Sequence, residues 1–430
     1  MNKRVAPALA AMAAIVALCW TVVGYGRKSG AGAPRLGWPY LFVWSGDAAH
    51  TASDFLAVID ANPDSPSYAR IVQTLPVEAK GMMPHHTEYE FPAGNVLFAN
   101  GWAGRRSFVF DLSEPLHPRL IGHFEGRAGY GFLHSFARLP NGNVLATFQS
   151  HGEGYAPGGG LVELKEDGSV VRSTSAVDPG VDKDLIWPYS LVVAPKADRI
   201  VSTSTVMGWP DWKELPAGSW PLEKINTKDT SQVQLWRFSD LHLLKTVTLP
   251  KDSGHHDENP AEPRLLSDGS VYVNTFRCGL FLMKGISGAQ PSAERVYSFP
   301  GGTDMDSLCA VPVVIGHYWI QTVGALPGLI ALDVSHPEKP IEVSRLTFDK
   351  QFAMPHWLAA DRKGDRVVVT GDEGSWVLVA RFDAENGKLT LDQTFREAGS
   401  AVPGINFDRE QWPHGKTGRA IVHGALFGPN

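Results

Sequence analysis

The stretch "LHSFARLPNGNVLATFQS" (residues 133–150) consists of two apolar runs separated by a turn rich in Pro, Asn and Gly. Such a turn between apolar runs is typical of a hairpin that joins two antiparallel strands. The same pattern of two apolar runs and a turn recurs at 85–101, 188–204, 261–276, 306–322 and 355–371. The leading residues of successive copies lie 44 to 73 residues apart. A repeat of this length predicts the four-stranded blades of a β-propeller.

A second pattern supplies the outer strands of each unit. In "VFDLSEPLHPRLIGHFEG" (109–126) an apolar run ends at Asp111, a turn with Pro115 and Pro118 follows, and a second run begins. Similar segments occur at 58–77 and 331–348. Proline lacks the N–H that a central strand needs, so it marks connections between strands.

Six such units leave strands unaccounted for at both ends of the chain. Residues 40–77 supply strands without an innermost partner, and "GRAIVHGALFGPN" (418–430) supplies one strand with nothing after it. Joining them removes the exposed sheet edges of an open array. We therefore predict an all-β fold over 34–430, a seven-bladed β-propeller closed by strands from both chain termini, with an insertion at 208–229 in the third unit.

Residues 1–33 differ from the rest of the chain. Lys3 and Arg4 precede an uncharged apolar run from Val5 to Tyr25, which indicates an export signal or an N-terminal membrane anchor. We expect an exported protein, either periplasmic or anchored and facing the periplasm, that contacts a membrane only through this segment. The net charge of −6 is spread without long basic runs, which argues against a nucleic acid partner.

Only two cysteines, Cys278 and Cys309, follow the N-terminal segment. They are compatible with one disulfide in an oxidising compartment or with two buried free thiols. The sequence leaves both possibilities open, and it contains no zinc-type spacing of Cys and His.

The innermost strands of a propeller line its channel, so the residues at their entrances should converge. These entrance residues are His85 and His86, His134, Tyr189 or Ser190, Glu262, Asp306, His356 and His423. A lone histidine at such a place is usually a hydrogen-bonded loop residue, but several at equivalent positions predict a metal site. Imidazole clusters suit copper, zinc or iron rather than calcium. His414 competes with His423 for the last entrance.

Glu262 and Asp306 are the acidic residues of this set. They are candidate catalytic groups that transfer protons, or groups that orient the imidazoles. The alternative is that they cap loops by accepting hydrogen bonds from backbone N–H groups.

The sequence resembles the selenium-binding protein / methanethiol oxidase family over nearly its whole length after the leader. The motifs that carry the resemblance are "FLAVIDANPDSPSYARIVQTLP" (55–76), "PHHTEYEF" (84–91), "GFLHSFARLPNGNVL" (131–145), "AEPRLL" (261–266), "LDVSHPEKP" (332–340) and "GRAIVHGALFGP" (418–429). The resemblance implies a seven-bladed propeller. It also implies a copper-dependent oxidase that converts methanethiol into formaldehyde, hydrogen sulfide and hydrogen peroxide.

Carried over by position, the family's metal ligands fall on His85, His86, His134 and His423. Two features depart from the family pattern. The cysteine pair that usually follows the His doublet is absent, and His356 has no counterpart as a ligand, so it is a candidate fifth imidazole.

We therefore expect an exported, metal-dependent oxidase of a small thiol that uses dioxygen, with copper preferred over zinc or iron. Two alternatives remain. One is a non-catalytic propeller that binds a metal or another ligand, and the other is a metal-dependent hydrolase or lyase on the same scaffold.

Overall fold

The computed structural model describes residues 40–428 except 153, 208–228, 252–257, 289, 353 and 373. The predicted leader and nearly all of the predicted insertion in the third unit lie outside these residues. No helix within the described ranges is long and apolar enough to cross a membrane.

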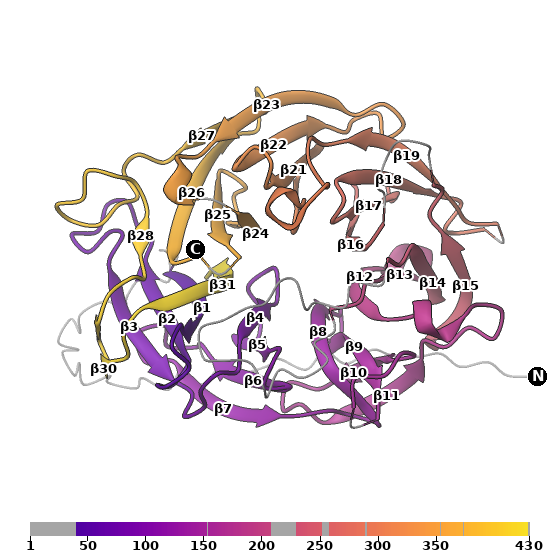
Figure 1. The fold of residues 1–430 in the computed structure, drawn as a ribbon, viewed down its shortest axis with the longest axis horizontal. Coiled ribbons are helices and arrows are strands. Elements are labelled where there is room, and N and C mark those ends of the chain that lie inside the picture. The colour runs from indigo at the N-terminus through magenta and orange to yellow at the C-terminus, as the bar shows by residue number, and fades with distance from the viewer. Residues whose placement is uncertain are drawn as a thin grey trace, which may run out of the picture. The chain divides into compact units, whose positions relative to one another are not determined.

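Seven antiparallel sheets form a ring, which confirms the predicted propeller (Figure 1). The first three blades in chain order have strands β4 (Pro84–Thr87), β5 (Val96–Gly101), β6 (Arg106–Asp111) and β7 (Arg119–Phe124), then β8 (Tyr130–Arg138), β9 (Val144–His151), β10 (Gly160–Leu164) and β11 (Val170–Ser175), then β12 (Pro188–Ala194), β13 (Arg199–Ser204), β14 (Gln232–Arg237) and β15 (His242–Thr248).

The next three blades follow the same order from the channel outward. Their strands are β16 (Pro260–Leu265), β17 (Val271–Thr275), β18 (Gly279–Lys284) and β19 (Ser292–Ser298), then β20 (Val313–Ile315), β21 (Tyr318–Val323), β22 (Gly328–Asp333) and β23 (Ile341–Thr347), then β24 (Pro355–Ala360), β25 (Arg366–Gly371), β26 (Trp376–Asp383) and β27 (Lys388–Leu391), with β28 (Ile405–Asn406) beside β26.

The seventh blade combines strands from both ends of the described chain. Its order is β31-β1-β2-β3, with β31 (Ala420–Phe427) innermost, then β1 (Tyr40–Asp47), β2 (Phe55–Asp60) and β3 (Ile71–Pro76). This is the closure that the sequence predicted. The remaining elements are a small hairpin, β29 (Gln411–Trp412) with β30 (Gly415–Lys416), and the 3-10 turns η1 (Lys183–Leu185), η2 (Pro195–Ala197), η5 (Met305–Ser307) and η6 (Lys350–Phe352).

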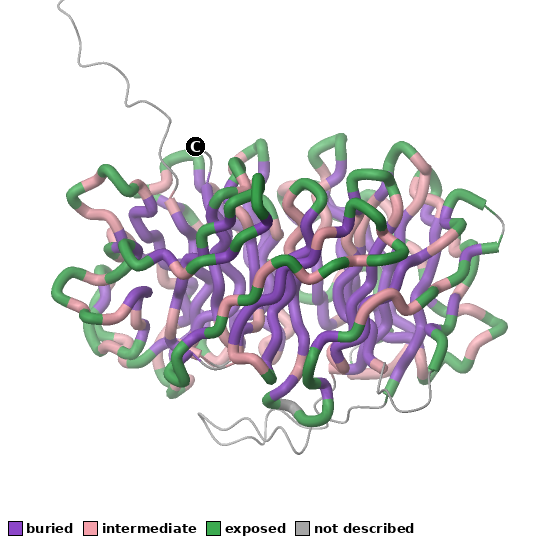
Figure 2. Tube along the Cα trace, turned by 90° about the horizontal axis from the view of Figure 1, so that it is seen from above, coloured by how far each residue is buried: buried purple, intermediate pink, exposed green. Residues whose placement is uncertain are grey.

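Apolar side chains between neighbouring blades form the core. In Figure 2 the buried segments run through the middle of the strands, and exposed loops border them. The seventh blade packs tightly against the first, because Trp44 of β1 meets Phe108 and Phe110 of β6 with ring centroids 5.2 and 5.6 Å apart. Several outermost strands alternate exposed and half-buried residues, as in β23, which is the pattern of a strand with one solvated face.

The inner strands share one irregularity. The pairing register shifts between Pro84 and Thr87 in β4, and at the matching place in β8, β12, β16, β24 and β31. Each shift is a β-bulge, which frees one or two residues from the ladder and re-aims their side chains. The candidate ligands lie in these bulges.

Candidate metal centre

Polar side chains of the second strand satisfy the backbone of the bulges in several blades. Thr147 Oγ1 accepts the N–H of Ser135 at 3.0 Å and donates to the carbonyl of Tyr189 in the next blade at 2.7 Å. Thr203 links Ser190 to Ala261 in the same way. The irregular backbone at the channel is therefore fully hydrogen-bonded at these points, and neighbouring blades are tied together there.

These side-chain hydrogen bonds between neighbouring blades show which residues are equivalent from blade to blade. Asn100 connects His86 to the carbonyl of His134, Asn274 connects Glu262 to the carbonyl of Cys309, and Thr370 donates to the carbonyl of His423. The residues at the first bulge position are thus His85, His134, Tyr189, Ala261, Cys309, His356 and His423. Four of these seven are histidine.

Four imidazoles meet at one point of the channel. Each of His85, His86, His356 and His423 offers a ring nitrogen, and these four atoms all lie within 4.8 Å of one another. His134 adjoins them, with its ring centroid 4.4 Å from His86 and 4.9 Å from His85. The structure therefore brings together all five histidines that the sequence indicated, which we call the histidine cluster.

Most of the histidine cluster is buried, and each of its histidines has at least one ring nitrogen without a hydrogen-bond partner among the described residues. His85, His86 and His134 are 2%, 0% and 0% exposed. Among the described residues, no hydrogen bond reaches His85 Nδ1, the Nε2 of His86, His134 or His356, or either ring nitrogen of His423. Because an unsatisfied buried polar atom is costly, the converging imidazoles of His85, His86, His356 and His423 fit a bound cation.

Neighbouring groups orient two of the rings. His134 Nδ1 lies 2.9 Å from the carbonyl of Tyr189 and must carry the hydrogen, so Nε2 keeps its lone pair. The hydroxyl of Ser135 lies 3.1 Å from His86 Nδ1 and 3.0 Å from His134 Nδ1. Such contacts fix the ring and leave the other nitrogen for a metal.

Burial also sets the charge of these histidines. It lowers the pKa of His85, His86, His134 and His423 well below the usual value, and the neighbouring imidazoles lower it further. A neutral imidazole is the form that binds a metal, so the donor set fits copper or zinc.

Sequence reasoning missed the carboxylate closest to the histidine cluster. Asp372, just after β25, lies 3.8 Å from His356 Nδ1 and 3.9 Å from His423 Nε2, and its side chain is 34% exposed. No local pattern distinguishes it from other turn residues, because its place depends on the close approach of β24, β25 and β31.

Glu262 occupies the second bulge position of its blade and is 0% exposed. Its Oε2 accepts hydrogen bonds from the Tyr89 hydroxyl at 2.7 Å, the Ser190 hydroxyl at 2.5 Å and Arg264 Nη1 at 2.8 Å. Glu262 thus reaches the histidine cluster only through intervening side chains.

The predicted place of Asp306 needs correction. Asp306 lies in η5 with an exposed side chain, and the channel position of the fifth blade belongs to Cys309. The sequence pattern placed the channel position of this blade three residues too early, because a 3-10 turn, rather than a strand, precedes the short β20. His414, the rival of His423, bonds Thr74 and Thr417 away from the channel.

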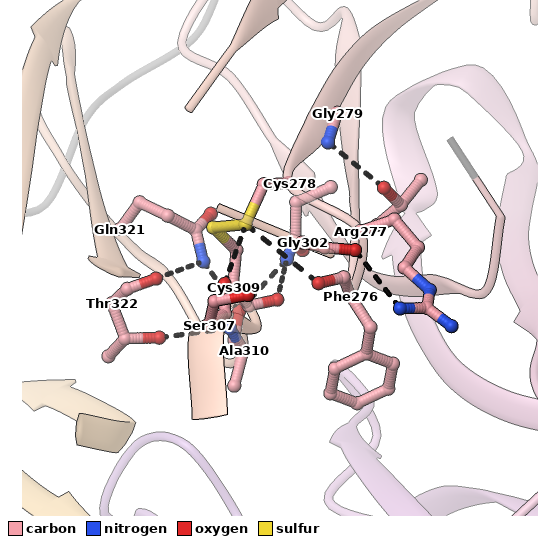
Figure 3. Close-up of a disulfide and its surroundings, with 12 residues drawn as sticks. Phe276, Arg277, Cys278, Gly279, Gly302, Ser307, Cys309, Ala310, Gln321 and Thr322 are labelled. Carbon is pink, nitrogen blue, oxygen red and sulfur yellow. Dashed lines mark hydrogen bonds between the residues drawn. A yellow bond between two sulfur atoms is a disulfide. The ribbon is translucent and has the colours of Figure 1, made fainter. Parts of the chain in front are cut away.

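Cys309 forms a disulfide with Cys278, with the two Cα atoms 5.0 Å apart (Figure 3). This finding decides between the two possibilities that the sequence left open. Cys278 lies between β17 and β18, and Cys309 precedes β20, so the bond ties the fourth blade to the segment that leads into the fifth.

The fold and the histidine cluster define a class, that of seven-bladed propellers with an imidazole site in the channel. No family model matches the chain. It is 31% identical to methanethiol oxidase of a Hyphomicrobium species over 183 residues, which are 40% of this chain and 39% of the relative. It is 24% identical to rat methanethiol oxidase over 65% of this chain and 57% of the relative.

Selenium-binding protein 1 of Arabidopsis thaliana is 25% identical over 35% of this chain and 33% of that protein. The solved structure of a hypothetical selenium-binding protein from Sulfolobus tokodaii superposes with a TM-score of 0.71 over 92% of this chain and 94% of the other, at 17% identity. A periplasmic gluconolactonase of Pseudomonas aeruginosa gives 0.62 at 14% identity, covering 91% and 99% of the two chains, so it shares the fold alone.

The chain is thus similar, at low identity, to methanethiol oxidases and selenium-binding proteins. The aligned segments span 33% to 59% of the curated relatives' own length. The similarity therefore does not by itself assign the activity of those proteins to this chain.

Proposed function

We propose that this protein is an exported copper oxidase of a small thiol, similar in activity to methanethiol oxidase. The observation that carries the proposal is that His85, His86, His356 and His423 each offer a ring nitrogen within 4.8 Å of the others. Each of them also has a ring nitrogen without a hydrogen-bond partner among the described residues. His85, His86, His356 and His423 would hold the metal, with His134 beside them. Copper bound there would supply one-electron redox chemistry and a soft centre that accepts a thiolate.

The chain's own residues can handle the thiol proton. Asp372 is the carboxylate at the edge of the histidine cluster, and its partial exposure lets it exchange protons with water. In the proposed reaction an Asp372 carboxylate oxygen takes the proton when the S–H bond breaks, and the buried imidazoles stay neutral. A buried donor set excludes bulk water from the sulfur.

The disulfide and the leader support export. A disulfide persists in an oxidising compartment such as the periplasm. The charged start and apolar run of residues 1–33 match a segment that directs a chain across a membrane.

The experiment is elemental analysis of the protein isolated from the exported fraction and reloaded with copper, followed by oxygen uptake with methanethiol. We expect about one copper per chain, and a fall of at least tenfold in copper affinity in His423→Ala and His356→Ala. His414→Ala is the matched control, because His414 is partly buried but lies outside the histidine cluster. Unchanged copper binding in the cluster variants would refute the site.

Oxygen uptake separates the alternatives. Copper-loaded protein that consumes no oxygen with any small thiol would favour a binding propeller. Turnover of another substrate without oxygen would favour a hydrolase or lyase.

A further inference from the structure

Two aromatic rings continue from the histidine cluster into the channel. The edge of Trp357 meets the His86 ring at a centroid distance of 4.9 Å. Tyr89 stacks on Trp357, with centroids 4.9 Å apart and planes only 9° from parallel, and its ring centroid lies 6.2 Å from that of His86. Tryptophan and tyrosine are the side chains that lose an electron most readily besides cysteine and methionine, so these contacts join an oxidisable pair to the candidate metal site.

The hydroxyl of Tyr89 has a buried base as its partner. It donates to Glu262 Oε2 at 2.7 Å, and Glu262 Oε1 has no hydrogen-bond partner among the described residues. The carboxylate is held by Arg264 at 2.8 Å. A proton that leaves the phenol therefore has an acceptor within hydrogen-bond distance.

Arg264 also restricts how Tyr89 can be oxidised. Its guanidinium lies over the Tyr89 ring, 4.1 Å from the centroid. This cation stabilises a neutral ring and disfavours a positively charged one. Tyr89 can then lose an electron only together with its proton.

We propose that Trp357 and Tyr89 form a one-electron store for the histidine cluster. In the step, an oxidised one-electron acceptor at the cluster takes one electron from Tyr89 through Trp357. The phenolic O–H bond breaks, the proton passes to Glu262 Oε2, and a neutral tyrosyl radical remains while the acceptor is reduced by one electron. The reverse step returns the electron and the proton.

The need for such a store rests on the proposed function. Oxidation of a thiol by dioxygen to give hydrogen peroxide moves electrons in pairs, whereas one copper ion cycles by a single electron. Tyr89 would supply the second one-electron carrier, which gives Glu262 a role as proton acceptor although it does not contact the histidines.

The chain contains a matched control. Tyr155 is also stacked on a tryptophan, Trp187, with centroids 4.6 Å apart. Its hydroxyl, however, donates to the neutral amide oxygen of Gln149 at 2.6 Å. Tyr155 therefore has the stack without a carboxylate that could take the proton.

The test is electron paramagnetic resonance of copper-loaded protein frozen after addition of hydrogen peroxide, with copper content measured first. We expect a tyrosyl radical in the wild-type protein and in Tyr155→Phe, and at least a tenfold weaker signal in Tyr89→Phe. Trp357→Phe should slow formation of the radical. Thermal unfolding verifies that each variant is folded.

The outcomes separate this proposal from the proposed function. A radical that persists in folded Tyr89→Phe, or no radical in protein with full copper content, overturns the store and leaves the oxidase proposal standing. If the protein binds no copper, the oxidase proposal fails. The metal-free protein is then oxidised by a photogenerated ruthenium(III) polypyridyl complex, and the absence of a signal that depends on Tyr89 overturns the store independently.

Discussion

At the scale of single residues, the histidine cluster depends on small partners as much as on the imidazoles. Asn100 and Thr147 hold the backbone of the bulges, and Ser135 lies between two of the rings. Gly424, next to His423, allows β31 to approach β4, since a Cβ there would lie 2.7 Å from the carbonyl oxygen of His85. Short polar or absent side chains thus let five bulky rings converge.

The lowered pKa values of the clustered histidines make the stability of the metal-free protein depend on pH. In the unfolded chain these groups titrate near pH 6.5, whereas the folded state resists protonation. The unfolded state therefore binds more protons as the pH falls below about 6.5, and each such histidine removes about 1.4 kcal/mol of stability per pH unit there.

Urea unfolding of chelator-treated protein between pH 7.5 and 5.5 measures this effect. We expect the midpoint to fall on acidification, and to fall less in His423→Gln. His242→Gln is the control, because it replaces an exposed histidine that lies outside the histidine cluster. Equal slopes in the wild-type protein and His423→Gln would contradict the prediction.

At the scale of strands and turns, the fifth blade shows how far the sequence could lead. The hairpin pattern predicted six units and placed His85, His134 and His356 at equivalent positions, because alternation and turn residues are local signals. It left His423 and His414 as rivals for the last entrance. The position of Cys309 depends on η5 and the short β20, which break the period. Asp372 and the Tyr89–Trp357 stack arise from contacts between distant segments, which no local pattern reveals.

The disulfide provides a prediction at this scale. It closes a loop between residues 31 apart in sequence, so it should stabilise the folded state by about 4 kcal/mol through the entropy of the unfolded chain. We expect the urea midpoint to fall in the double variant Cys278→Ala, Cys309→Ala. Reductant should lower the midpoint of the wild-type protein and leave the double variant unaffected. Identical midpoints for the two proteins would show that the bond contributes nothing.

At the scale of the whole propeller, one strand serves both stability and the site. β31 pairs with β1 along its length and also carries His423. It buries Val422, Leu426 and Phe427 in the core shared by the sixth, seventh and first blades. Ring closure and completion of the histidine cluster are therefore the same structural event.

Removal of β31 and substitution of His423 should separate these roles. Deletion of residues 420–430 should lower stability by on the order of 5 kcal/mol or more, because three large apolar side chains lose their burial and the ring opens. His423→Ala should keep the near-ultraviolet circular dichroism of the folded protein and lose only metal affinity. A truncated chain that unfolds at the wild-type temperature would show that the ring does not depend on β31.

Because His423 lies in the last strand, the histidine cluster can be completed only at the end of synthesis. The ribosome synthesises β4 and β8, which carry His85 and His134, early. It synthesises β31 after all the other strands of the described chain. Until β31 pairs with β1, the propeller ring is open and His423 is missing from the set of metal donors. A nascent chain would therefore hold an ion poorly, and the ion finally captured would be chosen by the compartment in which the ring closes.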